Sequence, residues 1–259
     1  MIYTALLRGL FSRIHGDPVE VDESAARALV IVADGVGGFA LCSTSLRHLV
    51  GRAGTGPAES TRVETLDWGH GLWRWYADLT RVERHVEQAA RLAERLATWN
   101  RTSGGRPAAL VGKSGGAGIV VKALEQCAPG SVENVVLLAP ALSPGYDLAP
   151  ALRAVRGEMV VFWSPLDLII LGLGTSIFGT IDRRHTSSAG LLGFRVPREG
   201  TKGSYARLRQ IRWRPSMIGL GYLGGHIGPD LPGFLRVHVL PIVTRGAGSE
   251  PRESLEPTE

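Results

Sequence analysis

The sequence predicts an α/β fold in which helices flank a mostly parallel central sheet. Short apolar runs rich in β-branched residues alternate along the chain with helical patterns, as is typical of strands joined by crossover helices. The run Ala28–Ala33 (ALVIVA) contains no polar residue, as expected for a strand buried on both faces. Hydrophobic residues make up 44% of the 259 residues and charged residues 20%, which excludes a wholly disordered chain.

Further elements are expected wherever these patterns recur. We place the other strands at 63–68, 107–111, 132–139, 158–163 and 206–213. Helices are expected at 39–50, 78–99, 115–126 and 149–155, and residues 168–193 mix apolar runs with glycines, which indicates helix and loop. The helix at 78–99 has the clearest amphipathic pattern, because its apolar residues recur mostly at three- and four-residue spacing.

The chain is expected to form a single domain over residues 1–243, since it contains no internal repeat. Residues 244–259 have no apolar face and are expected to be a disordered tail. No apolar run approaches the roughly 18–20 residues of a transmembrane helix, and the N-terminal residues do not have the pattern of a signal peptide. Two cysteines, Cys42 and Cys127, exclude a disulfide framework or a multi-cysteine metal site. We therefore expect a cytoplasmic location.

Basic residues are concentrated in one part of the chain. The net charge is +5, but residues 178–214 contain nine Lys or Arg and two acidic residues. This segment lacks the motif and interleaved aromatic residues of a nucleic-acid-binding surface, so we expect no nucleic-acid partner. Two interpretations stay open: a solvated basic insertion, or a surface that docks an anionic substrate, lipid headgroup or partner.

The most informative motif is Gly112-Lys113-Ser114-Gly115-Gly116, a G-x-S-x-G sequence. It follows the apolar run ALV directly and precedes the helical pattern GIVVKALEQ. A serine on such a tight strand-to-helix turn is held in a strained conformation with its hydroxyl above the sheet. The N–H groups that begin the helix then face the place where negative charge would develop.

With this motif and its setting, the chain resembles the α/β-hydrolase superfamily over roughly residues 28–240, in particular esterases and lipases with no lid or a small insertion. The resemblance implies that Ser114 is the nucleophile and that the N–H of Gly115 is one oxyanion donor. It implies a second donor in the glycine-rich loop after the strand at 28–33, either Gly35 or Val36. Asp34 stands where the family usually has a histidine, which is a departure from its pattern.

The resemblance also implies an acid and then a histidine after the serine. Asp167 follows the strand at 158–163 and should lie at the same sheet edge as Ser114, with Asp147 as the alternative acid. His226, in a glycine-rich loop after the last predicted strand, is the expected base, and His185 is the alternative. The remaining histidines are interpreted as structural or exposed, although His70 could border the pocket.

Together these residues imply nucleophilic acyl transfer on a small-molecule acyl ester, with no metal ion or organic cofactor. Whether the substrate is an ester, a thioester or an amide stays open. Two other functions also stay open. The segment Gly35–Ala40 matches the dinucleotide fingerprint G-x-G-x-x-A, although Glu64 and Asp67 come later than the ribose-binding carboxylate of an NAD(P)-dependent oxidoreductase. A catalytically silent α/β-hydrolase-like binding protein is the other alternative.

Overall fold

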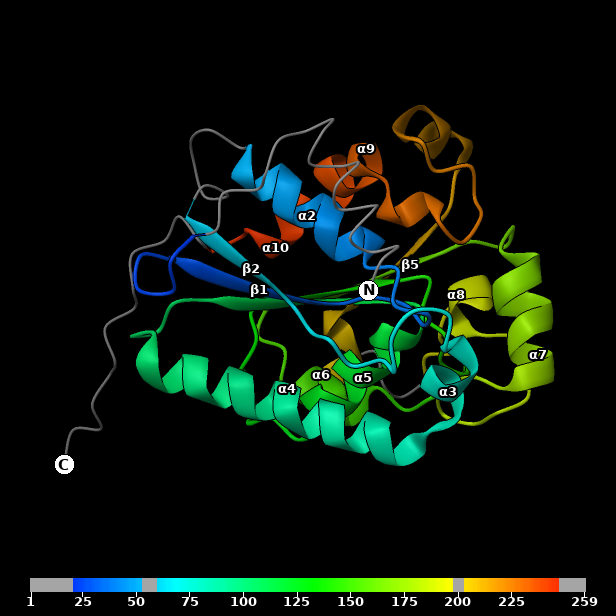
Figure 1. The fold of residues 1–259 in the computed structure, drawn as a ribbon, viewed down its shortest axis with the longest axis horizontal. Coiled ribbons are helices and arrows are strands. Elements are labelled where there is room, and N and C mark those ends of the chain that lie inside the picture. Colours follow the sequence, from blue (N-terminus) through cyan, green and yellow to red (C-terminus); the bar gives the residue numbers. More distant parts are fainter. Residues whose placement is uncertain (1–20, 53–59, 198–202, 247–259) are drawn as a thin grey trace.

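A computed structural model describes residues 21–52, 60–197 and 203–246. The described strands form one sheet in the order β2-β1-β3-β4-β5-β6, and every neighbouring pair is parallel. The bounds of these strands are β1 (Ala28–Ala33), β2 (Thr61–Thr65), β3 (Ala108–Lys113), β4 (Asn134–Leu138), β5 (Met159–Trp163) and β6 (Leu208–Arg212). The predicted α/β class with a mostly parallel sheet is confirmed (Figure 1).

Helices cover both faces of the sheet (Figure 1). One face carries α4 (Val82–Thr102), α5 (Gly115–Leu124) and α6 (Ala149–Arg153). The opposite face carries α2 (Leu41–Gly51), α9 (Pro232–Phe234) and α10 (Leu240–Val243). Crossovers between parallel strands require this arrangement, because each connecting helix packs back onto the sheet.

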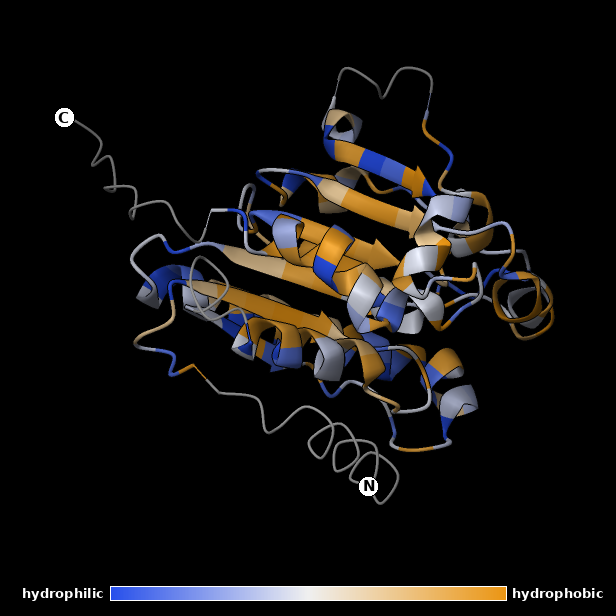
Figure 2. Cartoon of the chain, turned by 90° about the horizontal axis from the view of Figure 1, so that it is seen from above, coloured by the Kyte–Doolittle hydropathy of each residue, from blue (hydrophilic) through white to orange (hydrophobic). Residues whose placement is uncertain are grey.

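Alternate residues of β1, β3, β4 and β5 supply two hydrophobic cores. Leu29 and Ile31 of β1 belong to the core beneath α4 and α5, whereas Val30 and Val32 belong to the core beneath α2. All six residues of β1 are buried, which explains why its sequence is apolar without alternation. Figure 2 shows the same property along the central strands, which are coloured as hydrophobic over most of their length.

One predicted helix is two helices in the structure. The expected single helix at 78–99 is wrong, because α3 (Trp75–Thr80) ends and α4 begins around Arg81, whose ψ of 85° is not helical. The Asp78 carboxylate accepts a hydrogen bond from the N–H of Gly37, which lies outside the helix. The backbone carbonyl of Asp78 lies 2.5 Å from Nε2 of His85. These tertiary contacts favour a bend where the apolar periodicity alone predicts continuity.

Several short helical segments lie between β5 and the end of the described chain. Between β5 and β6 are the π-helix η1 (Leu168–Gly174), α7 (Thr175–Phe178), α8 (Ala189–Leu192) and the 3-10 helix η3 (Ser204–Arg207), so the expected mixture of helix and loop is confirmed. After β6 come η4 (Pro215–Leu220), η5 (Gly228–Asp230) and η6 (Leu235–Val239). Within the described ranges, no helix is both long enough and apolar enough to cross a membrane.

Two sequence predictions fall partly outside the described residues. Of the basic segment 178–214, Arg198 and Lys202 are not described. Of the expected tail 244–259, only residues 244–246 are described, and they form a turn after α10. In the part of the basic segment that is described, Arg209 pairs with Glu158 at 2.8 Å on the exposed edge of the sheet.

Candidate active site

The predicted site residues converge on one edge of the sheet. Gly35 follows β1, Ser114 follows β3 and Asp167 follows β5, and all three strands run in the same direction. Their carboxyl ends therefore lie together, at the edge where α/β proteins bind ligands. His226 reaches the same edge from the loop between η4 and η5.

Ser114 has a backbone conformation that few L-residues adopt. Its φ is 52° and its ψ is −117°, an arrangement that costs roughly 1–3 kcal/mol unless neighbouring contacts hold it. Its N–H donates to the carbonyl of Leu138 at 2.9 Å, and its own carbonyl accepts from Ala117 at 3.2 Å and from Ala141 at 3.0 Å. These bonds fix the turn between β3 and α5 that the motif predicts.

The glycines of the motif allow the strand and helix to meet at this turn. A Cβ atom on Gly112 would lie 2.6 Å from Cα of Ala117. A Cβ atom on Gly116 would lie 2.2 Å from the carbonyl oxygen of Ala33. Both distances are shorter than Cβ contacts in proteins, so neither position accepts a side chain without movement of the backbone.

Asp167 and His226 form a hydrogen-bonded pair. Nδ1 of the imidazole lies 2.6 Å from Oδ2 of the carboxylate, and both side chains are largely buried. Burial lowers the pKa of His226, and the nearby Lys113 cation lowers it further, against the opposing effect of Asp167. The imidazole is therefore neutral at neutral pH, and the carboxylate favours the tautomer whose Nε2 is free to accept a proton.

The hydroxyl of Ser114 and the imidazole of His226 lie on neighbouring segments. Nζ of Lys113, the residue before the serine, donates to the backbone carbonyl of His226 at 2.8 Å. No hydrogen bond joins Ser114 Oγ to the His226 ring, although both residues lie in the described part of the chain. Hydrogen bonds between catalytic groups are often long in unliganded sites and tighten when substrate binds.

Lys113 is a buried cation with a buried acidic neighbour. Its side chain is 4% exposed, and Nζ lies 3.7 Å from Oδ2 of Asp230, whose side chain is 8% exposed. Burial raises the pKa of Asp230 to about 7, although Lys113 acts in the opposite direction. The sequence contains no recognisable signal for this pair, since Lys113 occupies a variable position of the motif.

Asp34, the departure from the family pattern, binds the first turn of α2. Its Oδ1 accepts hydrogen bonds from the backbone N–H groups of Cys42 at 2.9 Å and of Ser43 at 3.2 Å. These N–H groups have no partner within the helix, and they attract a negatively charged group. Burial nevertheless raises the pKa of Asp34.

The two expected oxyanion donors lie against each other. A Cβ atom on Gly35 would lie 3.3 Å from Cβ of Ser114, and one on Gly115 would lie 2.8 Å from Cγ1 of Val36. Among the described residues, no acceptor uses the N–H groups of Gly35, Val36 or Gly115. The N–H of Gly37, by contrast, is used by Asp78 at 2.8 Å.

Asp78 anchors the glycine-rich loop and was missed by the sequence reasoning. It is 1% exposed and accepts hydrogen bonds from the N–H groups of Gly37 and His70 at 2.8 and 2.6 Å. Nδ1 of His70 lies 2.9 Å from the same carboxylate. The side chain and the backbone N–H of His70 therefore both contact the buried carboxylate of Asp78. The burial of Asp78 arises from contacts with distant segments, so no local pattern in the sequence marks this residue.

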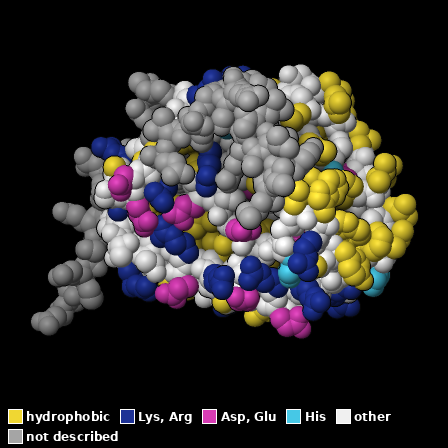
Figure 3. Space-filling model, viewed as in Figure 1, with side chains coloured by type: hydrophobic (Ala, Val, Ile, Leu, Met, Phe, Trp, Pro, Cys, Tyr) yellow, Lys and Arg dark blue, Asp and Glu magenta, His cyan; other side chains and the backbone are white. Residues whose placement is uncertain are grey.

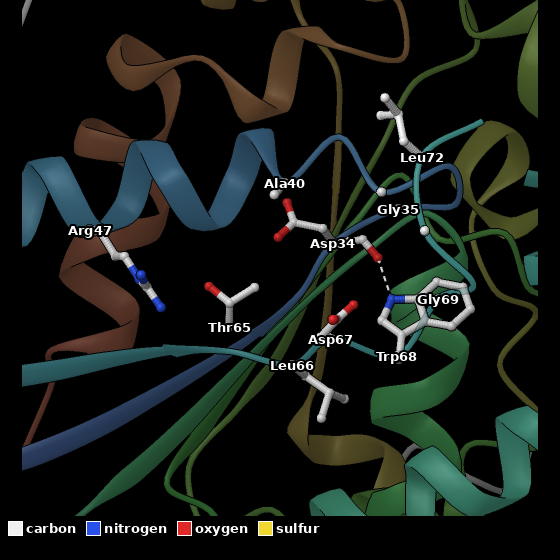
Figure 4. Close-up of a pocket in the computed structure, with 12 residues that line it drawn as sticks. Asp34, Gly35, Ala40, Arg47, Thr65, Leu66, Asp67, Trp68, Gly69 and Leu72 are labelled. Atoms are coloured by element: carbon white, nitrogen blue, oxygen red, sulfur yellow. Dashed lines mark hydrogen bonds between the residues drawn. The ribbon is translucent and has the colours of Figure 1, made fainter. Parts of the chain in front are cut away.

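Cavities lined by described residues lie beside the site, and two of them are formed by its predicted residues and their neighbours. The first, of about 380 Å³, lies beside the glycine-rich loop, and Figure 4 shows Asp34, Asp67 and Trp68 around it. Nε1 of Trp68 donates to the carbonyl of Asp34 at 2.8 Å, as drawn in Figure 4. The second cavity, of about 420 Å³, is lined by Asp167, His226 and apolar side chains.

The alternative site residues have other partners. Asp147 accepts from the hydroxyl of Tyr205 at 3.0 Å, and Nδ1 of His185 lies 3.1 Å from the carbonyl of Ile177. The structure does not pair either with a catalytic candidate. Glu64 accepts from Arg62 and Arg95, so its carboxylate is already occupied. The described residues contain no group of three or more His, Cys, Asp or Glu that could hold a metal ion.

Comparisons with known proteins give structural similarity at low sequence identity. No protein-family model matches the sequence, and no curated protein matches it. A cutinase of Trichoderma reesei, solved with a phosphonate inhibitor, is 15% identical, with 74% of this chain and 86% of that one covered and a TM-score of 0.46. A poly(3-hydroxybutyrate) depolymerase from Bordetella parapertussis is 15% identical, with 79% and 77% covered and a TM-score of 0.48. The carboxylesterase CesB from Bacillus subtilis is 11% identical, with 93% and 97% covered and a TM-score of 0.44.

The strands and helices of this chain define its fold. The six described strands are parallel, helices lie on both faces of the sheet, and a serine with positive φ lies between β3 and α5. The glycine-rich loop after β1 lies against that serine, as the sequence resemblance requires. The chain has an α/β fold in which helices flank a parallel sheet, with a tight strand-to-helix turn at Ser114.

Proposed function

We propose that the protein is a serine hydrolase that cleaves a carboxylic ester or thioester through an acyl-enzyme on Ser114. The observation that carries the proposal is the 2.6 Å contact between Asp167 and His226 at the sheet edge where Ser114 stands in its strained turn. A nucleophile, a base and a group that orients the base are the parts that covalent acyl transfer needs.

In the first half of the reaction, Oγ of Ser114 attacks the acyl carbonyl while Nε2 of His226 takes the hydroxyl proton. Asp167 holds the imidazole through Nδ1 and stabilises its charged form. The imidazolium then gives the proton to the departing alcohol or thiol, and the acyl group stays on Ser114. Water repeats the sequence in the second half, with His226 again as base, and the free acid leaves.

The oxyanion of each tetrahedral intermediate needs hydrogen-bond donors that are already in place. The N–H of Gly115 supplies one, and the N–H of Gly35 or of Val36 supplies the other. All three are unused by described acceptors, and the loop that holds Gly35 is fixed through Gly37 by Asp78. Loss of one such donor typically lowers kcat by about 10²–10³-fold.

A panel of p-nitrophenyl esters of increasing acyl length tests the proposal with Ser114→Ala and a matched control. Ser131→Ala is the control, because Ser131 precedes β4 at the opposite edge of the sheet. The proposal predicts turnover by the wild type and by Ser131→Ala, and loss of it in Ser114→Ala with the fold retained. Equal turnover by both variants would remove Ser114 from the reaction.

A catalytically silent binding protein is the second candidate. One observation favours it: among the described residues, Ser114 Oγ makes no hydrogen bond to His226. This candidate predicts that no ester of the panel is cleaved by the wild type, while acyl compounds still raise the Tm of the protein by binding to the folded state.

A further inference from the structure

An exposed apolar surface lies beside the Asp167–His226 pair. The segment that follows Asp167 is apolar almost throughout, yet only Leu171 and Thr175 of η1 and α7 are buried. Ile169 is 80% exposed, Leu173 63% and Ile177 55%. A helical segment in a folded domain normally turns such residues toward the core. Apolar residues exposed in this number indicate a binding surface.

This surface continues across the mouth of the cavity at His226. The cavity is lined by Leu166, Ile169 and Ile170 from the segment around Asp167, and by Leu223, Ile227 and Leu231 from the segment around His226. We call the exposed apolar side chains of residues 166–178 and 223–231 the apolar rim. Any surface that covers the apolar rim therefore also lies over the cavity that contains the Asp167–His226 pair.

Aromatic rings extend the apolar rim onto α3. The ring of Phe178 at the end of α7 lies 5.1 Å from that of Trp75 and 6.3 Å from that of Tyr76. Trp75 is 40% exposed and Tyr76 57%. Figure 3 shows hydrophobic side chains gathered on the side of the molecule where Figure 1 places α7 and α8. Partly exposed Trp and Tyr are the residues favoured at the boundary between lipid and water.

The exposed charges of the two segments that carry the apolar rim have one sign. Residues 164–195 and 215–232 contain three carboxylates, those of Asp167, Asp182 and Asp230. Each carboxylate has a partner within the protein at 3.7 Å or less. Asp167 contacts His226, Asp182 contacts Ser143, and Asp230 contacts Lys113. The exposed charges of the same two segments are the guanidinium groups of Arg183, Arg184 and Arg195. Arg183 donates to the carbonyl of Phe178 at 3.1 Å, which places its cation at the edge of the apolar rim.

We propose that the apolar rim docks the protein on the surface of an anionic phospholipid bilayer, with its apolar side chains among the acyl chains and Arg183 and Arg184 against the headgroups. Apolar burial combined with cations at the same depth is what holds peripheral proteins at such a surface. In the docked protein the cavity at His226 faces the bilayer, so the substrate would be a lipid ester. The assignment of this substrate rests on the proposed function, whereas the docking does not.

A second copy of the chain fits this surface less well. Two copies joined face to face through the apolar rim would bring the exposed arginines of both together, and the two rim segments offer no exposed carboxylate to neutralise them. An anionic bilayer supplies the missing negative charge.

Co-sedimentation of the full chain with lipid vesicles tests the docking without catalysis. The Ser114→Ala protein is mixed with vesicles of phosphatidylcholine alone, or of phosphatidylcholine and phosphatidylglycerol in equal parts. Docking predicts that the protein sediments with the anionic vesicles and that added salt weakens binding, because salt screens exposed charges over about 8 Å at physiological ionic strength. The Arg183→Gln/Arg184→Gln variant should lose most of the preference for phosphatidylglycerol.

The apolar contribution is tested by Leu173→Asp/Ile177→Asp in the same background. Both residues are exposed, so the Tm should stay near that of the parent, while vesicle binding falls about tenfold or more. Val86→Asp/Val237→Asp is the matched control, because Val86 on α4 is 54% exposed and Val237 on η6 is 47% exposed, and neither belongs to the apolar rim. The control variant should bind vesicles as the parent does.

Docking would be overturned if the protein did not sediment with anionic vesicles, or if it bound neutral vesicles equally well. It would also be overturned if the control variant lost as much vesicle binding as Leu173→Asp/Ile177→Asp. A fourth contrary result is a dimer that Leu173→Asp/Ile177→Asp dissociates while vesicle binding persists. These outcomes are separable from failure of the proposed function. Vesicle binding by a protein that cleaves no ester would support docking and reject the hydrolase, and ester cleavage without vesicle binding would do the reverse.

Discussion

Nζ of Lys113 donates a hydrogen bond to the backbone carbonyl of His226 at 2.8 Å, across a sequence separation of 113 residues. The residue that precedes the proposed nucleophile therefore holds the loop that carries the proposed base. Because Lys113 is a cation within reach of the imidazole, it also lowers the pKa of His226. One side chain thus affects both the position and the protonation of the proposed base.

Lys113→Met should change the pH dependence of hydrolysis. Loss of the cation raises the pKa of His226, and the base acts only when neutral, so the acidic limb of kcat/KM should move to higher pH. A pH profile on a soluble ester measures this shift. Lys113→Met/Asp230→Asn is the companion variant, because it avoids an unpaired buried carboxylate. An unmoved limb in both variants would show that Lys113 has no electrostatic effect on the base.

Asp167→Asn should lower kcat strongly with little effect on folding. Without the carboxylate the imidazole would lose its preferred tautomer and its stabilised charged form, and the equivalent change in a Ser-His-Asp triad lowers kcat by about 10⁴-fold. Asp147→Asn is the matched control, because Asp147 contacts Tyr205 and no histidine. Steady-state kinetics of both variants choose between the two acids; greater damage from the change at Asp147 would reverse the assignment.

Asp230 should make the folded state less stable as pH rises. Its folded-state pKa is raised to about 7 from an ordinary value of 3.8, so the folded state holds the proton more tightly than the unfolded chain does. The contribution of the Asp230 proton to the free energy of unfolding is fully present below about pH 4 and is lost as pH rises to about 7. Urea unfolding of the wild type and of Asp230→Asn from pH 4 to 8 measures this contribution. As pH rises, the unfolding free energy of the wild type should fall relative to that of Asp230→Asn. A difference that does not vary with pH would contradict the raised pKa.

Gly116→Ala should destabilise the elbow. The added methyl would lie 2.2 Å from the carbonyl oxygen of Ala33 and 2.3 Å from that of Asp34, so the helix or the strand must move. Overpacking of this kind typically costs about 1–3 kcal/mol of unfolding free energy. Gly145→Ala is the control, because its Cβ would meet nothing within 4 Å. Equal unfolding free energies for the two variants would mean that the turn tolerates a side chain.

Sequence patterns predicted the parts of this structure that depend on local rules. Buried strands such as β1 are recognisable because both of their faces must be apolar, and the strained turn at Ser114 is recognisable because only small residues fit beside it. The pairing of Asp167 with His226 was expected from the resemblance to α/β-hydrolases, which implies an acid and then a histidine after the serine, and from the shared edge of a parallel sheet.

The remaining features depend on contacts between distant segments. The bend between α3 and α4 arises where Asp78 bonds to Gly37 and His70, and no local pattern reports such partners. The contact between Lys113 and His226, and the exposure of the apolar segment after Asp167, likewise depend on tertiary packing. Apolar periodicity identifies which residues are hydrophobic, but not whether another element covers them.

Reaction with a fluorophosphonate probe tests the central claim most directly, since the probe modifies only a serine that is activated as a nucleophile. Peptide mapping after labelling should place a single adduct on Ser114, and labelling should be lost in Ser114→Ala and slowed strongly in Asp167→Asn. An adduct on another residue, or labelling that persists in Ser114→Ala, would contradict the account.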